Sequence, residues 1–228
     1  MNQPSWQEVW SRRGGLGDGS VDLDSLIKLD GFDTGAGCID ADDWRIYAGL
    51  IADRLGMQDD ETVYEVGCGA GAFLYALHER YSLAVGGLDY SAGQIAAALQ
   101  AMPNGEFKVA EANALDIVPA YDYVIANGVF LYLGLDYAAE VLQRMTKKAK
   151  TAVAILEIPD FQTKSESEAM RRDALTQEDY EKKYAGLEHT YFQRDWFRSQ
   201  AAACGFSCEV FDGCVPNYVP NKFRFCVL

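Results

Sequence analysis

A glycine-rich turn carries the residues of this sequence that are best suited to hold a ligand. The segment TVYEVGCGAGAF, residues 62 to 73, places Gly67, Gly69 and Gly71 directly after a short apolar run. Glycine adopts positive φ without strain and has no Cβ, so the backbone of such a turn can approach a ligand closely. Asp89 ends the next apolar run, and its carboxylate is suited to accept hydrogen bonds from a ribose diol. A nucleoside-containing ligand is therefore the first hypothesis.

Glu65 narrows the class of ligand. A P-loop is excluded because no Lys-Ser or Lys-Thr pair closes the turn. Gly67, Gly69 and Ala72 satisfy the weaker dinucleotide pattern, so these three residues alone leave that class open. Glu65 stands two residues before the first glycine, where its negative charge would repel a pyrophosphate. The turn favours a ligand with a positive charge, such as the ammonium of an amino acid.

Strands and helices alternate around this turn. Apolar runs predict strands at residues 62–66, 82–90, 106–112, 121–128 and 151–158. Helices are predicted at residues 39–57, 72–81, 92–102 and 136–150, with Asp40 and Ser91 as N-caps. A further helix at 194–206 precedes two strands at 207–213 and 221–228. This alternation indicates right-handed βαβ units and a parallel sheet covered by helices on both faces.

We interpret the chain as one α/β domain with a doubly wound, mostly parallel seven-stranded sheet. Residues 1–58 are expected to form an N-terminal arm and helix, and residues 62–157 the cofactor-binding core. Residues 158–192 are expected to form an insertion after the fifth strand, on the acceptor side, and residues 193–228 a C-terminal helix and strands.

Four motifs across residues 62–157 resemble class I S-adenosylmethionine (SAM)-dependent methyltransferases. VYEVGCGAGAF resembles the first motif of the family, GLDYS the second, EANAL the third and YDYVIANGVFLYL the fourth. The motifs occur in the order and spacing of the family. The resemblance implies a Rossmann-like methyltransferase fold, SAM as the cofactor and S-adenosylhomocysteine (SAH) as its product. It also implies methyl transfer to a small-molecule acceptor.

The resemblance assigns roles to individual residues. Glu65 and the turn would surround the amino-acid end of the cofactor, and Asp89 would accept hydrogen bonds from its ribose. Tyr90, Asn113 and Ala114 would border adenine, although the family often has Asp where this chain has Asn113. Asn127 and Val129 would border the methionine moiety. The complete expected set is Glu65, Gly67, Cys68, Gly69, Asp89, Tyr90, Asn113, Ala114, Asn127 and Val129.

Candidates for a general base lie after the fifth strand. His189 is the first choice because the ordinary pKa of histidine lies near neutrality, and Tyr191 is the second. Glu157 is also a second choice, but the favoured interpretation is that it ends the fifth strand with a structural hydrogen bond. The glycine-containing stretch at 29–40, with Phe32, Asp33 and Thr34, and the aromatic stretch at 182–197 are expected to cover the acceptor. The dibasic pairs Arg171-Arg172 and Lys182-Lys183 could attract an anionic substrate to the insertion, but a solvated helix face is the favoured interpretation.

The composition of the chain restricts the classes of partner that we expect it to bind. The chain has 34 acidic residues against 20 Lys and Arg, a net charge of −14, which argues against nucleic acid and anionic membranes. The sequence has no membrane-spanning run, no N-terminal secretory signal, no C-x-x-C pair and only two histidines, so neither a membrane anchor nor a metal site is predicted. We expect a reduced, cytoplasmic protein, monomeric or homodimeric.

Oxygen is preferred over nitrogen as the methylated atom because a base is available, and by analogy the pathway is secondary metabolism or sugar tailoring. Two alternatives stay open. One is an NAD(P)-dependent oxidoreductase on the same type of fold, and the other is a non-catalytic SAM-binding module.

Overall fold

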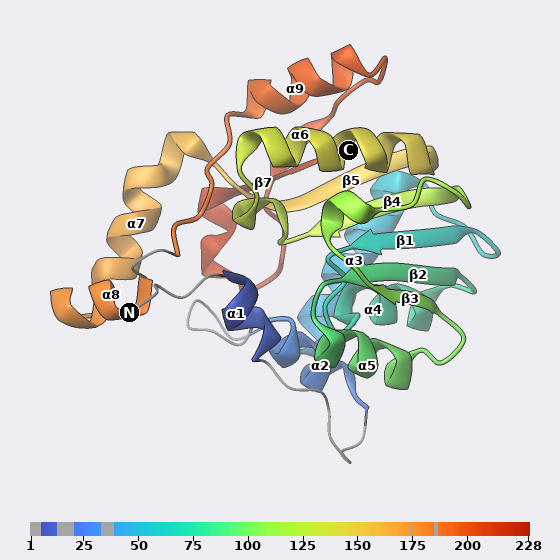
Figure 1. Ribbon diagram of the computed structural model, residues 1–228, viewed down its shortest axis with the longest axis horizontal. Helices are drawn as coiled ribbons and strands as arrows, with labels where there is room; N and C mark the ends of the chain where they lie inside the picture. Colours follow the sequence, from blue (N-terminus) through green and yellow to red (C-terminus); the bar gives the residue numbers. More distant parts are fainter. Residues whose placement is uncertain (1–5, 13–20, 33–38, 174, 185–186) are drawn as a thin grey trace.

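The core of the protein is a β-sheet whose strands follow the order β3-β2-β1-β4-β5-β7-β6 (Figure 1). The computed structural model describes residues 6–12, 21–32, 39–173, 175–184 and 187–228, and seven strands lie within this part of the chain. They are β1 (Thr62–Val66), β2 (Ala84–Asp89), β3 (Glu106–Val109), β4 (Tyr121–Asn127), β5 (Ala149–Pro159), β6 (Val210–Asp212) and β7 (Arg224–Val227). β1 to β5 pair in parallel, whereas β7 is antiparallel to β5 and β6. The predicted doubly wound, mostly parallel sheet is confirmed.

Helices cover both faces of the sheet. On one face pack α3 (Ala41–Leu55), α4 (Ala72–Arg80) and α5 (Ala92–Ala101), and on the other α6 (Leu135–Lys148) and α9 (Arg194–Ala203). Successive residues of β4 alternate between the two cores: Tyr123 and Ile125 pack with the first group, and Val124 and Ala126 with the second. Burial on both sides explains why the parallel strands read as nearly continuous apolar runs.

Chain order reverses between β1 and β4, and this reversal locates the site. From β1 the chain proceeds outward through β2 and β3, and then returns to the other side of β1 to form β4 and β5. The crossover helices diverge at such a switch point, so a crevice opens beyond the carboxyl ends of β1 and β4. The glycine-rich turn follows β1 at this place.

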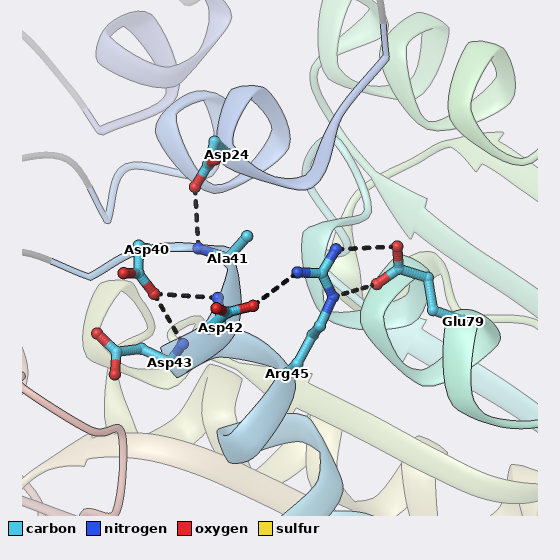
Figure 2. A network of polar contacts seen from close by, with 7 residues as sticks. All are labelled: Asp24, Asp40, Ala41, Asp42, Asp43, Arg45 and Glu79. Carbon is cyan, nitrogen blue, oxygen red and sulfur yellow. Dashed lines mark hydrogen bonds and ion pairs between the residues drawn. The ribbon is translucent and has the colours of Figure 1, made fainter.

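A polar network fixes the N-terminal helices against α4 (Figure 2). Asp40 caps α3, since its carboxylate accepts hydrogen bonds from the backbone N–H groups of Asp42 and Asp43. The backbone N–H of Ala41 donates to Asp24 in α2 (Leu23–Leu29). Arg45 of α3 forms a two-point contact with Glu79 of α4. Together these contacts connect α2, α3 and α4.

The insertion after β5 begins and ends at the same place, next to the end of that strand. Its two ends are tied together, because Phe192 N donates to Pro159 O and Phe161 N donates to Phe192 O, each at 2.9 Å. Between these ends the chain forms α7 (Lys164–Asp173) and α8 (Gln177–Tyr184). Figure 1 shows α7 and α8 beside α1 (Trp6–Ser11) at the left of the view. In the described part of the N-terminal arm, two short helices, α1 and α2, precede α3.

Candidate active site

A cavity of about 1150 Å³ lies beyond the carboxyl ends of β1, β2, β4 and β5. Its wall on one side is the glycine-rich turn with Glu65 and Asp89. On the other side it is formed by α7, His189 and the segment that enters β7. Asp33 and Thr34, expected to cover this region, lie outside the described residues, whereas Phe32 lines the cavity. One continuous space therefore joins the predicted cofactor side to the predicted acceptor side.

The glycine-rich turn has the backbone that its sequence predicts. Gly67, Gly69 and Gly71 all have positive φ, at 69°, 53° and 85°. The N–H groups of Gly67 and Cys68 both donate to Leu88 O, which fastens the turn to β2. A Cβ on Gly67 would lie 2.5 Å from Val129 Cγ2, so the turn after β1 and the turn after β4 touch directly. Cys68 is buried, and it lines the cavity together with Gly67, Gly69 and Val129.

We predict that Gly67→Ala destabilises the protein by about 2–4 kcal/mol, the sum of left-handed strain and a steric overlap with Val129. Gly56→Ala is a matched control, because Gly56 has φ of 71° and a Cβ there would meet no atom within 4 Å. Only the strain, about 1 kcal/mol, is expected for the control. Urea unfolding of both variants measures the difference. Equal losses would show that contact with Val129 is not what requires a glycine at position 67.

Asp30, which follows α2, was not identified from the sequence. Its carboxylate crosses the glycine-rich turn and accepts hydrogen bonds from the backbone N–H groups of Ala70 and Ala72, the latter at 3.0 Å. These donors belong to the start of α4, where free N–H groups and the helix dipole favour a negative charge. No local motif marks Asp30 as a partner of residues 40 positions away, so only the packing of α2 reveals it.

Three carboxyl groups, those of Glu65, Asp30 and Asp89, meet around the turn. Glu65 is 3% exposed and its Oε2 has no hydrogen-bond partner among the described residues. Burial, followed by the charges of Asp30 and Asp89, raises the pKa of Glu65 well above its ordinary value. A buried carboxyl group without a partner is costly, and a cationic ligand would relieve that cost. The chemistry of this cluster fits the ammonium and sulfonium charges of SAM.

Asp89 is held rigidly at the end of β2. One carboxylate oxygen accepts a hydrogen bond from Gly69 N at 3.1 Å, and the other accepts one from Ser91 N at 2.8 Å. Burial raises its pKa, while these two hydrogen bonds lower it. Each oxygen retains a lone pair toward the cavity that Asp89 lines. Next to it, Tyr90 lines the cavity and donates its hydroxyl to Trp6 O at 3.3 Å.

Two of the residues expected to border adenine do not lie at the cavity wall. Asn113 and Ala114 lie in the short helix η1 (Ala112–Ala114), and neither is among the residues that line the cavity. The neighbouring residues Glu111 and Ala112 occupy the wall instead. The backbone of Asn113 donates to Tyr137 Oη at 3.3 Å, which holds η1 against α6. The motif therefore located the correct loop, but the structure shifts the wall toward the N-terminal end of η1.

Two residues predicted from the fourth motif, Asn127 and Val129, line the cavity. Asn127, at the end of β4, is 9% exposed, and its Oδ1 accepts a hydrogen bond from Tyr47 Oη at 3.1 Å. Because its carbonyl oxygen is held in this way, the amide of Asn127 has a fixed orientation at the cavity wall. Val129 follows Gly128, whose φ is 67°. A role for these residues at the methionine moiety stays a prediction.

His189 lines the cavity but is not arranged as a base. Its Nδ1 lies 2.6 Å from Arg171 Nη2, and a guanidinium can only donate, so Nδ1 is the acceptor and the proton of the neutral ring lies on Nε2. Burial, followed by the charges of Arg171 and Arg224, lowers the pKa of His189 to about 2. His189 therefore acts as a hydrogen-bond donor, which corrects the first base assignment.

Tyr191 does not reach the cavity wall. Its hydroxyl lies 3.3 Å from Ser167 Oγ and donates to it, and Tyr191 is not among the lining residues. The second base assignment is corrected as well, because the hydroxyl of Tyr191 holds the C-terminal end of the insertion against α7 of the same insertion.

Glu157, expected to be structural, has the features of a reactive group. It lies in β5 with φ of 58°, an unfavourable backbone conformation for a residue with a Cβ. It is 3% exposed and lines the cavity, and neither carboxylate oxygen has a hydrogen-bond partner among the described residues. Burial raises the pKa of Glu157 to about 7, with the charge of Arg224 acting against this rise.

Helix α1 covers the cavity from the N-terminal arm. Trp6 stacks on the ring of His189 with centroids 5.0 Å apart and packs against Tyr132 at 4.8 Å. On the other side of the cavity, Gln7 donates to Glu111 at 2.7 Å. α1 therefore connects the two sides of the cavity and shields it from solvent.

Two classes of feature are absent from the described part of the chain. Within it, no three His, Cys, Asp or Glu side chains are grouped in a way that could hold a metal ion. Among the same residues, no helix has both the length and the apolar character needed to cross a membrane.

Comparison with known proteins identifies the class. Residues 63–152 match the family described as methyltransferase domain. A trans-aconitate 2-methyltransferase of Methylobacterium nodulans is 31% identical over 129 residues, which are 56% of this chain and 49% of that protein. This chain thus spans about half the length of that curated relative.

Solved structures share the fold across most of the chain. Magnesium protoporphyrin IX methyltransferase from Synechocystis PCC 6803, with bound SAM, superposes with a TM-score of 0.58 at 18% identity, covering 96% of this chain and 87% of that one. The SAM-bound amino pentose methyltransferase from Micromonospora echinaspora gives 0.57 at 17% identity, covering 81% and 90%.

The fold and the cavity define a protein of the class I methyltransferase architecture. More particularly, residues 63–152 match the methyltransferase-domain family, in agreement with the resemblance stated from the four motifs.

Proposed function

We propose that this chain is a SAM-dependent methyltransferase that methylates a small molecule, with oxygen preferred over nitrogen as the acceptor atom. The observation that carries the proposal is the single cavity that runs from the acidic glycine-rich turn to a second group of polar residues. A cofactor-binding module without catalysis would need only the first half of this space. The second half provides room for an acceptor.

The residues at the turn fit the cofactor. Glu65, buried and with an oxygen lacking a partner, would hold the ammonium of its amino-acid part, and Asp89 its ribose. The same negative charges disfavour the pyrophosphate of NAD, which weighs against an oxidoreductase. When bound, SAM supplies a methyl group already attached to a good leaving group.

The protein must supply the other requirements of methyl transfer. It must place the acceptor atom, exclude water and remove a proton where the acceptor carries one. Glu157 is the side chain proposed to take that proton, because neither of its oxygens has a hydrogen-bond partner among the described residues and burial raises its pKa to about 7. A hydroxyl group gives up its proton as it is methylated, so a resident base supports the preference for oxygen. The cover provided by α1 supports the exclusion of water.

The relatives support a small molecule as the substrate. These proteins are named for trans-aconitate, magnesium protoporphyrin IX and an amino pentose. The acidic charge of −14 supports a substrate other than nucleic acid. Cytoplasmic location, a monomeric or homodimeric state, and a place in secondary metabolism or sugar tailoring stay predictions.

Calorimetry tests the cofactor. We expect SAH to bind with a micromolar or tighter dissociation constant and NAD to show no heat of binding under the same conditions. NAD binding without SAH binding would establish the oxidoreductase alternative. Incubation of the protein and SAM labelled in its methyl group with a metabolite extract then tests transfer, because a labelled product distinguishes an enzyme from a binding module.

A further inference from the structure

Two arginines face the acceptor half of the cavity without an acidic partner. Arg171 lies on α7 and Arg224 at the start of β7, and both line the cavity. Both are only partly exposed. Within the described residues, neither guanidinium forms an ion pair with a carboxylate. By contrast, Arg194, which also lies near β7, is paired with both Asp160 and Asp212.

The polar contacts that these arginines make are with neutral groups. Arg171 donates to Nδ1 of the neutral His189 at 2.6 Å. Arg224 donates to the backbone oxygen of Glu157 at the long distance of 3.4 Å. Neither contact neutralises a positive charge. The remaining donors of both side chains are therefore available to a ligand.

His189 adds a third donor to the same place. Its Nε2 carries the ring proton, is buried, and has no hydrogen-bond partner among the described residues. A buried N–H without an acceptor costs free energy comparable to a lost hydrogen bond. Arg171, His189 and Arg224 line the same cavity, and the charges of both arginines depress the pKa of His189 after the larger effect of burial. The two guanidinium groups and the Nε2–H of His189 can each only donate.

The charge of the whole chain makes this arrangement informative. In a protein with 34 acidic and 20 basic residues, arginines are readily paired, as Arg45, Arg54, Arg80 and Arg194 are. Arg171 and Arg224 line the cavity with no ion pair among the described residues, and they create a local positive site beside a cofactor region that is itself acidic. Glu157 also lines the cavity, and burial raises its pKa to about 7 against the charge of Arg224, so its carboxyl group neutralises that charge only in part. Such a site is complementary to an anion, and guanidinium groups bind carboxylates and phosphates through paired hydrogen bonds.

We propose that the methyl acceptor carries an anionic group, a carboxylate or a phosphate, which Arg171, Arg224 and the Nε2–H of His189 bind. This inference rests on the proposed methyltransferase function, since it names the class of acceptor for the same cavity. The acidic turn and the arginine site then divide the cavity by charge. The cationic cofactor is attracted to one half and the anionic acceptor to the other, which orients the two reactants before transfer.

Separation of a metabolite extract by charge tests whether the methyl acceptor is an anion. A metabolite extract is separated by anion exchange into a flow-through, containing neutral and cationic compounds, and a retained fraction, containing anions. Each fraction is incubated with the full chain and SAM labelled in its methyl group. We expect the label to enter the retained fraction. Treatment of that fraction with phosphatase before the assay separates the two sources, because it removes a phosphate acceptor and leaves a carboxylate acceptor intact.

Substitutions of the two arginines then test whether these side chains bind the anionic group of the acceptor. Arg171→Gln and Arg224→Gln are each expected to raise the KM for the retained acceptor by about tenfold or more, with a smaller effect on kcat. Arg172→Gln is the matched control, because Arg172 is exposed, is not among the lining residues and lies over the ring of Tyr180. It should keep KM within twofold. Unchanged SAH affinity in all three variants would show that the cofactor half is intact.

Label in the flow-through, or an Arg171→Gln variant that matches Arg172→Gln, would overturn the inference while leaving methyl transfer established. Failure of SAH to bind, or SAH binding with no label in either fraction, would instead overturn the proposed function, and the inference with it.

Discussion

Asp89→Ala is expected to weaken SAH binding by about 100-fold. Two hydrogen bonds between a carboxylate and the ribose hydroxyls are worth about 3 kcal/mol or more together, which corresponds to this loss in affinity. The side chain also accepts hydrogen bonds from Gly69 N and Ser91 N, so its removal loosens the turn that the cofactor must contact. Isothermal titration calorimetry of the purified variant gives the affinity directly.

A control and a second substitution separate binding from support of the backbone. Asp116→Ala removes an exposed carboxylate that pairs with Lys108 and does not line the cavity, so SAH affinity should be unchanged. Asp89→Asn keeps the size and one oxygen but loses the charge, and its affinity should fall between those of the wild type and the alanine variant. If Asp89→Ala lowers thermal stability yet leaves SAH affinity intact, Asp89 serves the turn alone and the cofactor lies elsewhere.

The residues proposed to hold the cofactor could be placed near one another from the sequence because they lie within short motifs. Glu65, Gly67 and Gly69 follow one strand, Asp89 ends the next, and Asn127 ends a third. The carboxyl ends of neighbouring parallel strands meet at one edge of a sheet, so strand assignment alone brings these residues together. The fold was predictable for the same reason, since alternating strands and helices at this spacing leave few arrangements.

The acceptor half could not be predicted, because it depends on contacts between distant segments. Whether Nδ1 of His189 accepts or donates a hydrogen bond is decided by Arg171, which lies 18 residues earlier on α7. Asp30 reaches the turn only because α2 packs against α4. The two residues of the pair Arg171-Arg172 point differently, one toward the cavity and the other toward solvent, although their sequence context is the same. Glu157 illustrates the same limit, since a glutamate at the end of a strand gives no sign of positive φ.

The second substitution that we expect to have a large effect is at Glu157. Glu157→Gln is expected to reduce methyl transfer by about 100- to 1000-fold, the usual contribution of a positioned base, while SAH affinity is retained. Glutamine has nearly the same shape and is neutral, so packing in the buried site is preserved. Transfer is measured with SAM labelled in its methyl group and the acceptor found in the extract. Glu209→Gln, which removes an exposed carboxylate paired with Arg54, is the control and should transfer at the wild-type rate.

The pH dependence distinguishes a base from a structural carboxyl group. With the pKa of Glu157 at about 7, the proton-accepting form increases as pH rises, so wild-type kcat/KM should climb through about pH 7 and then level off. The glutamine variant should lack this rise. A residual rate that still titrates near pH 7 in Glu157→Gln would assign the proton to another group.

Stability should change with pH in the opposite direction, and this measurement needs no acceptor. The folded protein raises the pKa of Glu157 from 4.5 to about 7, so folding favours the protonated form. The contribution of that carboxyl group is complete below pH 4.5 and is lost as pH rises through 7. Glutamine cannot ionise, so the free energy of unfolding of Glu157→Gln relative to wild type should increase by about 3 kcal/mol between pH 4.5 and pH 8. Urea unfolding across this range measures the difference, and a constant difference would mean that Glu157 has no raised pKa to support its role as a base.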